Sequence, residues 1–173
     1  MIGKGACGAV YAARHDSGAR IAVKVLKAAS CNPEVIENQL NRLYRTECPA
    51  GAVPLEAHSL GKTPILLLAS LEADRVEQEI GEVFVPRTLQ IRLADYLGQP
   101  GSWGLILKLA EVLADFHRRR VSHGNLKPGN IFFGGDDQLM LSDFAQGLMP
   151  GIRELPYTDA LLYAPPEQLT DPE

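Results

Sequence analysis

The stretch His123-Gly124-Asn125-Leu126-Lys127-Pro128-Gly129-Asn130 separates a helical pattern from a predicted hairpin. The helical pattern is an apolar stripe at the spacing of one helix face, and it predicts a helix from Ser102 to Arg120. The stripe consists of Leu105, Leu109, Val112, Leu113 and Phe116. After the stretch, apolar triplets at 131–133 and 139–141 flank two glycines and two aspartates, a pattern typical of a β-hairpin. The stretch itself is therefore predicted to be a loop between these elements.

Glycines cluster at the start of the chain, where Gly3, Gly5 and Gly8 follow a G-x-G-x-x-G spacing. Glycines of this kind let backbone N–H groups approach phosphates, although glycine clusters also serve ordinary turns. A strand-like stretch, 10–12, follows them where a dinucleotide-binding fold would have a helix. The order favours a glycine-rich hairpin that covers phosphates.

Lys24 ends the stretch Ile21-Ala22-Val23-Lys24 inside a predicted strand, 20–26. A charge in a buried strand is costly without a partner, so a lysine facing solvent would be the ordinary explanation. The glycine loop one hairpin earlier favours phosphate binding instead. An acidic side chain would then hold the lysine. Glu37, on a helix predicted to begin at 32–34, is the first choice, and Glu34, one turn earlier, is the alternative.

With these features together, the chain resembles eukaryotic-type Ser/Thr protein kinases. The stretch at 123–130 is similar to the His-Arg-Asp-Leu-Lys-Pro-x-Asn catalytic loop of that family. Ser142-Asp143-Phe144-Ala145 resembles the Asp-Phe-Gly metal motif, and Tyr163-Ala164-Pro165-Pro166-Glu167 resembles the Ala-Pro-Glu motif. Five motifs in the family's order span nearly the whole chain, which makes a chance occurrence improbable.

The resemblance implies an α+β, bilobal, protein-kinase-like fold. Residues 1–71 would form a small ATP-binding lobe, an antiparallel sheet with one helix, with strands that include 53–60 and 64–71. Residues 72–101 would hold the hinge, an insertion and the first large-lobe helix, with 72–86 polar and irregular. Residues 102–173 would form the first part of a mainly helical large lobe. The hinge itself is expected near 68–71.

The resemblance also assigns ATP and Mg²⁺ as cofactors and names the residues that would hold them. Lys24 would contact the phosphates and pair with Glu37, while Asn130 and Asp143 would hold magnesium. The other nucleotide-contacting residues implied are Gly3, Gly5, Gly8, Val10, Ala22 and Phe132. Asn125 and Lys127 occupy the catalytic positions.

Asn125 stands where the family has the aspartate that orients and deprotonates the substrate hydroxyl. A carboxamide cannot act as a base at neutral pH. Gly124 replaces an arginine, and Ala145 replaces a glycine. These departures favour a pseudokinase, a nucleotide-binding signalling module with impaired phosphotransfer. The alternatives are a slow but genuine Ser/Thr kinase that uses Lys127, and a protein-interaction module with a vestigial nucleotide site.

Composition excludes several other classes of protein. A net charge of −4 gives no basic excess for nucleic acid or a membrane surface, and another protein is the expected partner. The run Arg118-Arg119-Arg120 is interpreted as a solvated helix end. Three cysteines without metal spacing suit a reducing, cytoplasmic location. Because the usual later helices of the large lobe are not in this sequence, we expect a longer protein and an exposed stripe on the helix 102–120.

Overall fold

The computed structural model describes most of the two regions expected to form lobes. The described residues are 1–4, 8–18, 20–26, 38, 41, 48–53, 55–61, 63–69, 73–78, 81–135, 138–143, 162–163 and 166. The predicted helix that begins at 32–34 lies mostly outside these residues. Asn38 and Asn41 are described, and both are helical.

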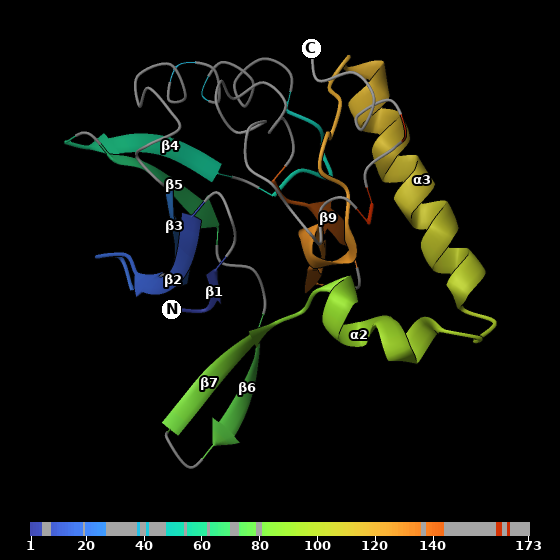
Figure 1. Cartoon of the computed structure of the whole chain (residues 1–173), viewed down its shortest axis with the longest axis horizontal. Coiled ribbons are helices and arrows are strands. Elements are labelled where there is room, and N and C mark those ends of the chain that lie inside the picture. The colour runs from blue at the N-terminus through green and yellow to red at the C-terminus, as the bar shows by residue number, and fades with distance from the viewer. Residues whose placement is uncertain are drawn as a thin grey trace.

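The first part of the chain forms the expected antiparallel sheet, in the order β1-β2-β3-β5-β4 (Figure 1). Its strands are β1 (Gly3–Lys4), β2 (Gly8–Arg14), β3 (Arg20–Leu26), β4 (Leu55–Leu60) and β5 (Thr63–Ala69). The β2–β3 turn is closed by a hydrogen bond from the Gly18 N–H to the His15 carbonyl, with Gly18 at a φ of 85°. A residue that tolerates positive φ, such as glycine, suits that turn.

Residues 73–86 correct the expectation of an irregular segment. They form a hairpin of β6 (Ala73–Gln78) and β7 (Gly81–Pro86), which projects away from the sheet in Figure 1. The register sets Val76 opposite Val83 and Arg75 opposite Phe84. Valine and phenylalanine favour strands, and the acidic residues around them obscured this signal in the sequence.

The hinge expectation also changes. Leu68 and Ala69 lie within β5, where they pair with Ala22 and Ile21 of β3. The connection between the two parts of the molecule therefore begins after Ala69, and it carries the β6–β7 hairpin. Residues 70–72 lie outside the described part of the chain.

The second part contains two helices packed on a small hairpin. Helix α2 (Leu89–Tyr96) and helix α3 (Ser102–Arg118) are joined by a short turn, and β8 (Ile131–Phe133) pairs with β9 (Leu139–Leu141). A 3-10 turn, η2 (Pro128–Asn130), leads into β8. The α+β architecture expected from the sequence, a sheet followed by a helical part, is confirmed.

The hydrophobic core lies between α3 and the β8–β9 hairpin. Its buried members are Ala52, Leu89, Phe116, Val121, Ile131, Phe133, Leu139 and Leu141. The predicted stripe on α3 faces this core, with Phe116 fully buried and the other four members packed against it. Full burial of each large apolar side chain contributes about 1.5–3 kcal/mol. The expectation of an exposed stripe was therefore wrong.

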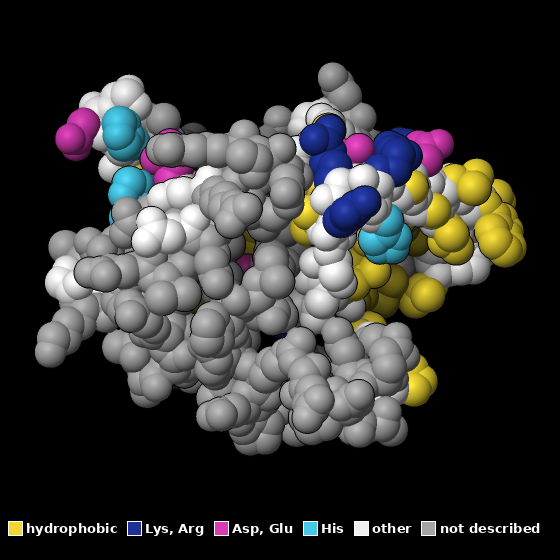
Figure 2. Space-filling view, turned by 90° about the horizontal axis from the view of Figure 1, so that it is seen from above, with side chains coloured by type: hydrophobic (Ala, Val, Ile, Leu, Met, Phe, Trp, Pro, Cys, Tyr) yellow, Lys and Arg dark blue, Asp and Glu magenta, His cyan; other side chains and the backbone are white. Residues whose placement is uncertain are grey.

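The exposed hydrophobic residues of α3 lie on another face. Trp103, Ile106 and Leu107 are 73%, 52% and 64% exposed, and Figure 2 shows hydrophobic side chains beside basic ones on one side of the molecule. Ser102 does not cap the helix through its side chain, because Gly101 occupies the cap position. The Ser102 hydroxyl instead donates to the carbonyls of Tyr96 and Gln99, which fixes the α2–α3 turn.

Candidate nucleotide and metal site

Strand β3 positions Lys24 between the two parts of the molecule. Lys24 is only 7% exposed, and its Nζ lies 2.6 Å from Oδ1 of Asp143, which is 119 residues away in sequence. A buried ammonium group requires a partner of opposite charge, and Asp143 supplies it. The structure thus brings together the residue predicted to hold phosphates and one of the residues predicted to hold magnesium.

Glu37 and the alternative Glu34 lie outside the described residues, so the predicted Lys24–Glu37 pair stays a prediction. Gly5 lies outside them as well. Among the described residues, the partner of Lys24 is Asp143. Phe144 and Ala145, the rest of the predicted metal motif, are also outside the described part.

The strand register sets the predicted nucleotide contacts of the sheet on one face. Val10 pairs with Lys24, and Ala12 pairs with Ala22, so Val10, Ala22 and Lys24 share a face. At Gly8 a Cβ atom would approach the Val25 carbonyl oxygen to 2.1 Å, so the close strand pairing requires glycine there. At Gly3 the nearest atom would be 3.8 Å away, and packing imposes no such need.

Phe132 is the middle residue of β8. Its neighbours Ile131 and Phe133 are buried in the core, while Phe132 is half-buried and pairs with Met140. Because side chains alternate along a strand, Phe132 faces away from that core. Its predicted place beneath a nucleotide base stays a prediction.

The loop 123–130 is held by hydrogen bonds that run between its own residues. The Asn130 Nδ2 donates to the Asn125 carbonyl at 2.8 Å, and the Asn125 N–H donates to His123 Nδ1 at 3.2 Å. Asn130 is 5% exposed, and its own carbonyl accepts from the Ser142 N–H at 3.0 Å. Asn125, the predicted metal ligand Asn130 and Ser142, the residue before Asp143, are thus joined by hydrogen bonds.

Two backbone conformations in this region are unusual. Gly124 has a φ of 69°, in the left-handed region that favours glycine. An arginine at this position would carry steric strain, so the glycine relieves strain besides removing a guanidinium group, an effect the sequence alone did not reveal. Asp143 has a φ of 57°, which aspartate tolerates better than most residues.

His123 is buried and titrates abnormally. Burial lowers the pKa of His123 to about 4, against the opposing effects of the Asp143 charge and a hydrogen bond with the Ser142 backbone. Its ring lies 6.1 Å from the Phe116 ring, centroid to centroid. At neutral pH the imidazole is therefore neutral. Lys127, the other predicted catalytic residue, is half-buried in the same loop.

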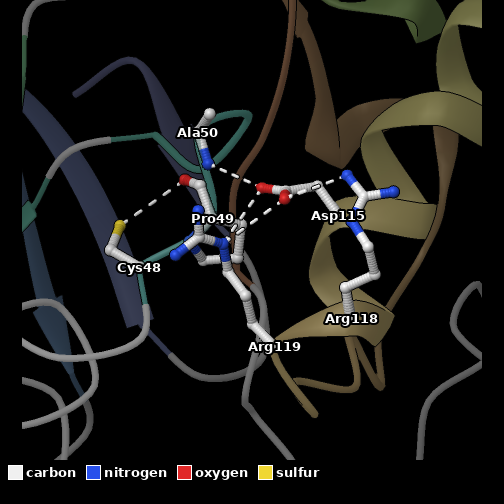
Figure 3. A network of polar contacts seen from close by, with 6 residues as sticks. All are labelled: Cys48, Pro49, Ala50, Asp115, Arg118 and Arg119. Atoms are coloured by element: carbon white, nitrogen blue, oxygen red, sulfur yellow. Dashed lines mark hydrogen bonds and ion pairs between the residues drawn. The ribbon is translucent and has the colours of Figure 1, made fainter.

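A polar network that sequence reasoning missed joins α3 to residues 48–50 (Figure 3). Asp115 Oδ2 accepts from the Ala50 N–H at 3.0 Å, and both carboxylate oxygens contact Arg119. Arg118 Nη2 lies 3.2 Å from Asp115 Oδ1. The Ala50 hydrogen bond, with help from the two guanidinium groups, lowers the pKa of Asp115.

The basic run at 118–120 was interpreted as a solvated helix end, and the structure agrees, because α3 ends at Arg118 and all three arginines are exposed. Arg118 and Arg119 also form ion pairs on this surface. Both bind Asp115, which lies three and four residues earlier on α3. That spacing places side chains next to each other on a helix, so it was the available sequence signal.

Several known kinases are similar in sequence to this chain. No known family model matches the chain. The chain is 28% identical to Aurora kinase B of Xenopus tropicalis, in an alignment that covers 97% of this chain and 45% of that protein. It is also 28% identical to Aurora kinase of Schizosaccharomyces pombe, over 99% of this chain and 47% of that protein. With sperm motility kinase 2B of Mus musculus the identity is 25%, over 97% and 33%.

The chain is similar to protein kinases. This similarity runs over almost its whole length, in agreement with the α+β fold and the order of the motifs. The chain spans about half the length, 45% to 47%, of the two Aurora kinases it matches.

Proposed function

We propose that this protein-kinase-like domain binds ATP with Mg²⁺ and acts as a signalling or regulatory module with impaired phosphotransfer. The observation that carries the proposal is the Lys24–Asp143 contact beside a loop in which Asn125 replaces the expected aspartate. The residues suited to nucleotide binding are present, while the proton acceptor is not.

The donor set fits magnesium. Mg²⁺ prefers oxygen ligands and is usually held by one or two carboxylates together with substrate phosphates. Asp143 supplies a carboxylate, and Asn130 supplies an amide oxygen because its Nδ2 is engaged by the Asn125 carbonyl. In the described ranges, no group of three or more His, Cys, Asp or Glu side chains gathers as a metal centre, so phosphates would complete the ligand set.

Lys24 supplies the positive charge for the phosphates. Its ammonium is nearly buried and already directed toward Asp143, so little side-chain ordering would remain to be done on binding. Magnesium, when bound, would neutralise phosphate charge and orient the terminal phosphate group.

The impairment follows from the chemistry of Asn125. Loss of a general base typically costs about 10²- to 10⁴-fold in rate. Phosphoryl transfer depends strongly on positioning, so a slow, genuine Ser/Thr kinase is the second candidate, favoured by the kinases among the relatives. An interaction module without nucleotide is the third. The retained Lys24, Asn130 and Asp143 argue against it.

The expected partner is another protein, either a substrate or a regulated target. No helix in the described part of the chain is long and apolar enough to cross a membrane. A cytoplasmic location stays a prediction from the cysteines.

Nucleotide binding is tested by thermal melting of the whole protein with ATP, in the presence of Mg²⁺ or of EDTA. A ligand at 100 times its Kd stabilises the native state by roughly 2.7 kcal/mol, so Mg²⁺ with ATP should raise the melting temperature clearly. Lys24→Ala should abolish most of that increase. The matched control is Lys108→Ala, an exposed lysine on α3. No increase for the wild type at millimolar ATP would support the interaction module instead.

A further inference from the structure

A route of main-chain hydrogen bonds leads from Asp115 to both predicted metal ligands. It begins where the Asp115 carboxylate accepts the Ala50 N–H at 3.0 Å. The next residue, Gly51, accepts the Leu141 N–H at 2.7 Å, and the Val53 N–H donates to the Leu141 carbonyl at 2.9 Å. Residues 51–53 thus extend the β8–β9 hairpin as a third, parallel segment, bridged at Ala52.

From Leu141 the route reaches the site within two residues. The Ser142 N–H donates to the Asn130 carbonyl at 3.0 Å, and Asp143 follows with its contact to Lys24. Leu141 is completely buried, and Ser142 is 8% exposed. In so closely packed a region, a shift of the segment 51–53 would be transmitted to the backbone that carries Asn130 and Asp143.

Asp115 is suited to fix that segment because it is itself fixed. Arg119 holds both of its oxygens, at 3.2 Å and 3.4 Å, and Arg118 holds one. Figure 3 shows the carboxylate directed at the Ala50 nitrogen between the two guanidinium groups. Gly51, the residue after Ala50, packs directly on α3, because a Cβ atom added to it would approach the Val112 side chain to 2.5 Å.

We propose that Asp115, held by Arg119, is a positioning residue for the magnesium ligands Asn130 and Asp143, acting through residues 50–53 and Leu141. The proposal rests on the proposed nucleotide function, since it names which remote residue adjusts that site. Residues that orient metal ligands commonly change metal affinity about 10- to 100-fold when they are mutated. Asp115 does not contact Asn130 or Asp143 directly in the proposed route but acts through the residues between them. We therefore expect a change in metal affinity at the lower end of that range, about tenfold.

The test compares Asp115→Ala, Asp115→Asn and the control Asp95→Ala in the full chain. Asp95 also pairs with an arginine on a helix, at 3.6 Å, and its side chain is 65% exposed. The first measurement is the Kd of ATP with Mg²⁺ and with EDTA. In Asp115→Ala the Kd with Mg²⁺ should rise about tenfold, while the Kd in EDTA changes less than about twofold. Asp115→Asn keeps an acceptor for the Ala50 N–H and should recover most of the Mg²⁺ dependence.

The second measurement is amide hydrogen exchange at Leu141 and Ser142 without nucleotide. Exchange should accelerate in Asp115→Ala and stay at the wild-type rate in Asp95→Ala. Unchanged exchange at these amides would overturn the positioning role, whether or not the wild type binds ATP. Equal changes of the Kd with Mg²⁺ and in EDTA would overturn it too. Failure of the wild type to bind ATP would refute the proposed function alone.

If Asp115→Ala does not fold, Arg119→Gln takes its place in both measurements, because it leaves Asp115 in position. The same changes in Kd and in amide exchange are expected for it, and the same results would overturn the positioning role.

Discussion

Two contacts between the first and the second part of the chain differ in kind. Lys24 of β3 meets Asp143 through one ion pair between side chains. Residues 50–53 meet Leu141 through main-chain hydrogen bonds, with Asp115 fixing Ala50. A bound cation and phosphates can replace an ion pair, because they offer the same charges. They cannot replace a backbone ladder. The first contact is therefore suited to respond to ligand, and the second to hold the two parts in register.

The largest effect on stability is expected from His123, whose ring packs on Phe116 and lies close to Asp143. An unfolded histidine titrates near 6.5 and the folded one at about 4, so the unfolded state binds the extra proton first. Stability should be unaffected by this group above pH 6.5 and should fall as the pH drops from 6.5 to 4. The total loss is roughly 3 kcal/mol.

The measurement is urea unfolding of the wild type and His123→Gln at several pH values. The glutamine variant has no proton to gain, so its stability should fall less steeply between pH 6.5 and 4. The carboxylates of the protein titrate in both proteins and cancel in the difference. Parallel curves across that range would contradict the neutral, buried state of His123.

A smaller effect, about 1–3 kcal/mol of destabilisation, is expected from Gly51→Ala, because it overpacks a site against Val112. This change strains the ladder contact and leaves the ion pair intact. Because a shift of residues 51–53 would reach the backbone that carries Asn130 and Asp143, the stabilisation by ATP with Mg²⁺ should decrease in part, whereas Lys24→Ala should abolish most of it. Val112→Ala in the same chain should restore part of the loss, since it removes the obstructing methyl groups.

The control for Gly51→Ala is Gly104→Ala. Gly104 lies on α3, and in the described part of the chain no heavy atom comes within 4 Å of the place that an added methyl group would occupy. Alanine there should leave stability unchanged or raise it by up to about 1 kcal/mol. If Gly51→Ala behaved like this control, the close packing of the segment on α3 would be refuted.

Sequence patterns predicted the parts of this fold that depend on short-range periodicity. The strands β2 to β5, the stripe of α3 and the β8–β9 hairpin each follow from alternation or helical spacing. The β6–β7 hairpin was missed because acidic residues surround its valines. The strand limits at Leu55 and Ala69 also differed from the predicted ones, since pairing with neighbouring strands decides where a strand ends.

In the candidate site too, local sequence patterns predicted the residue types, while the contacts between distant residues could not be predicted. The motifs identified Lys24, Asn130 and Asp143 by residue type, and register placed Val10 and Ala22 beside Lys24. The Lys24–Asp143 contact joins residues far apart in sequence, so no local pattern could reveal it. The positive φ of Gly124 and the Ala50–Asp115 hydrogen bond depend likewise on tertiary structure.

Impaired phosphotransfer is tested most directly by Asn125→Asp. Aspartate and asparagine are nearly isosteric, and two hydrogen bonds of Asn125 within the loop use its backbone N–H and carbonyl, which the substitution keeps. The substitution should therefore restore an acceptor for the substrate proton without moving the loop. Transfer of radiolabelled phosphate from ATP to a generic basic protein, and to the domain itself, would be measured for both proteins. The variant should recover part of the roughly 10²- to 10⁴-fold deficit. A wild type already as fast as Asn125→Asp would contradict the impaired state and establish a genuine kinase.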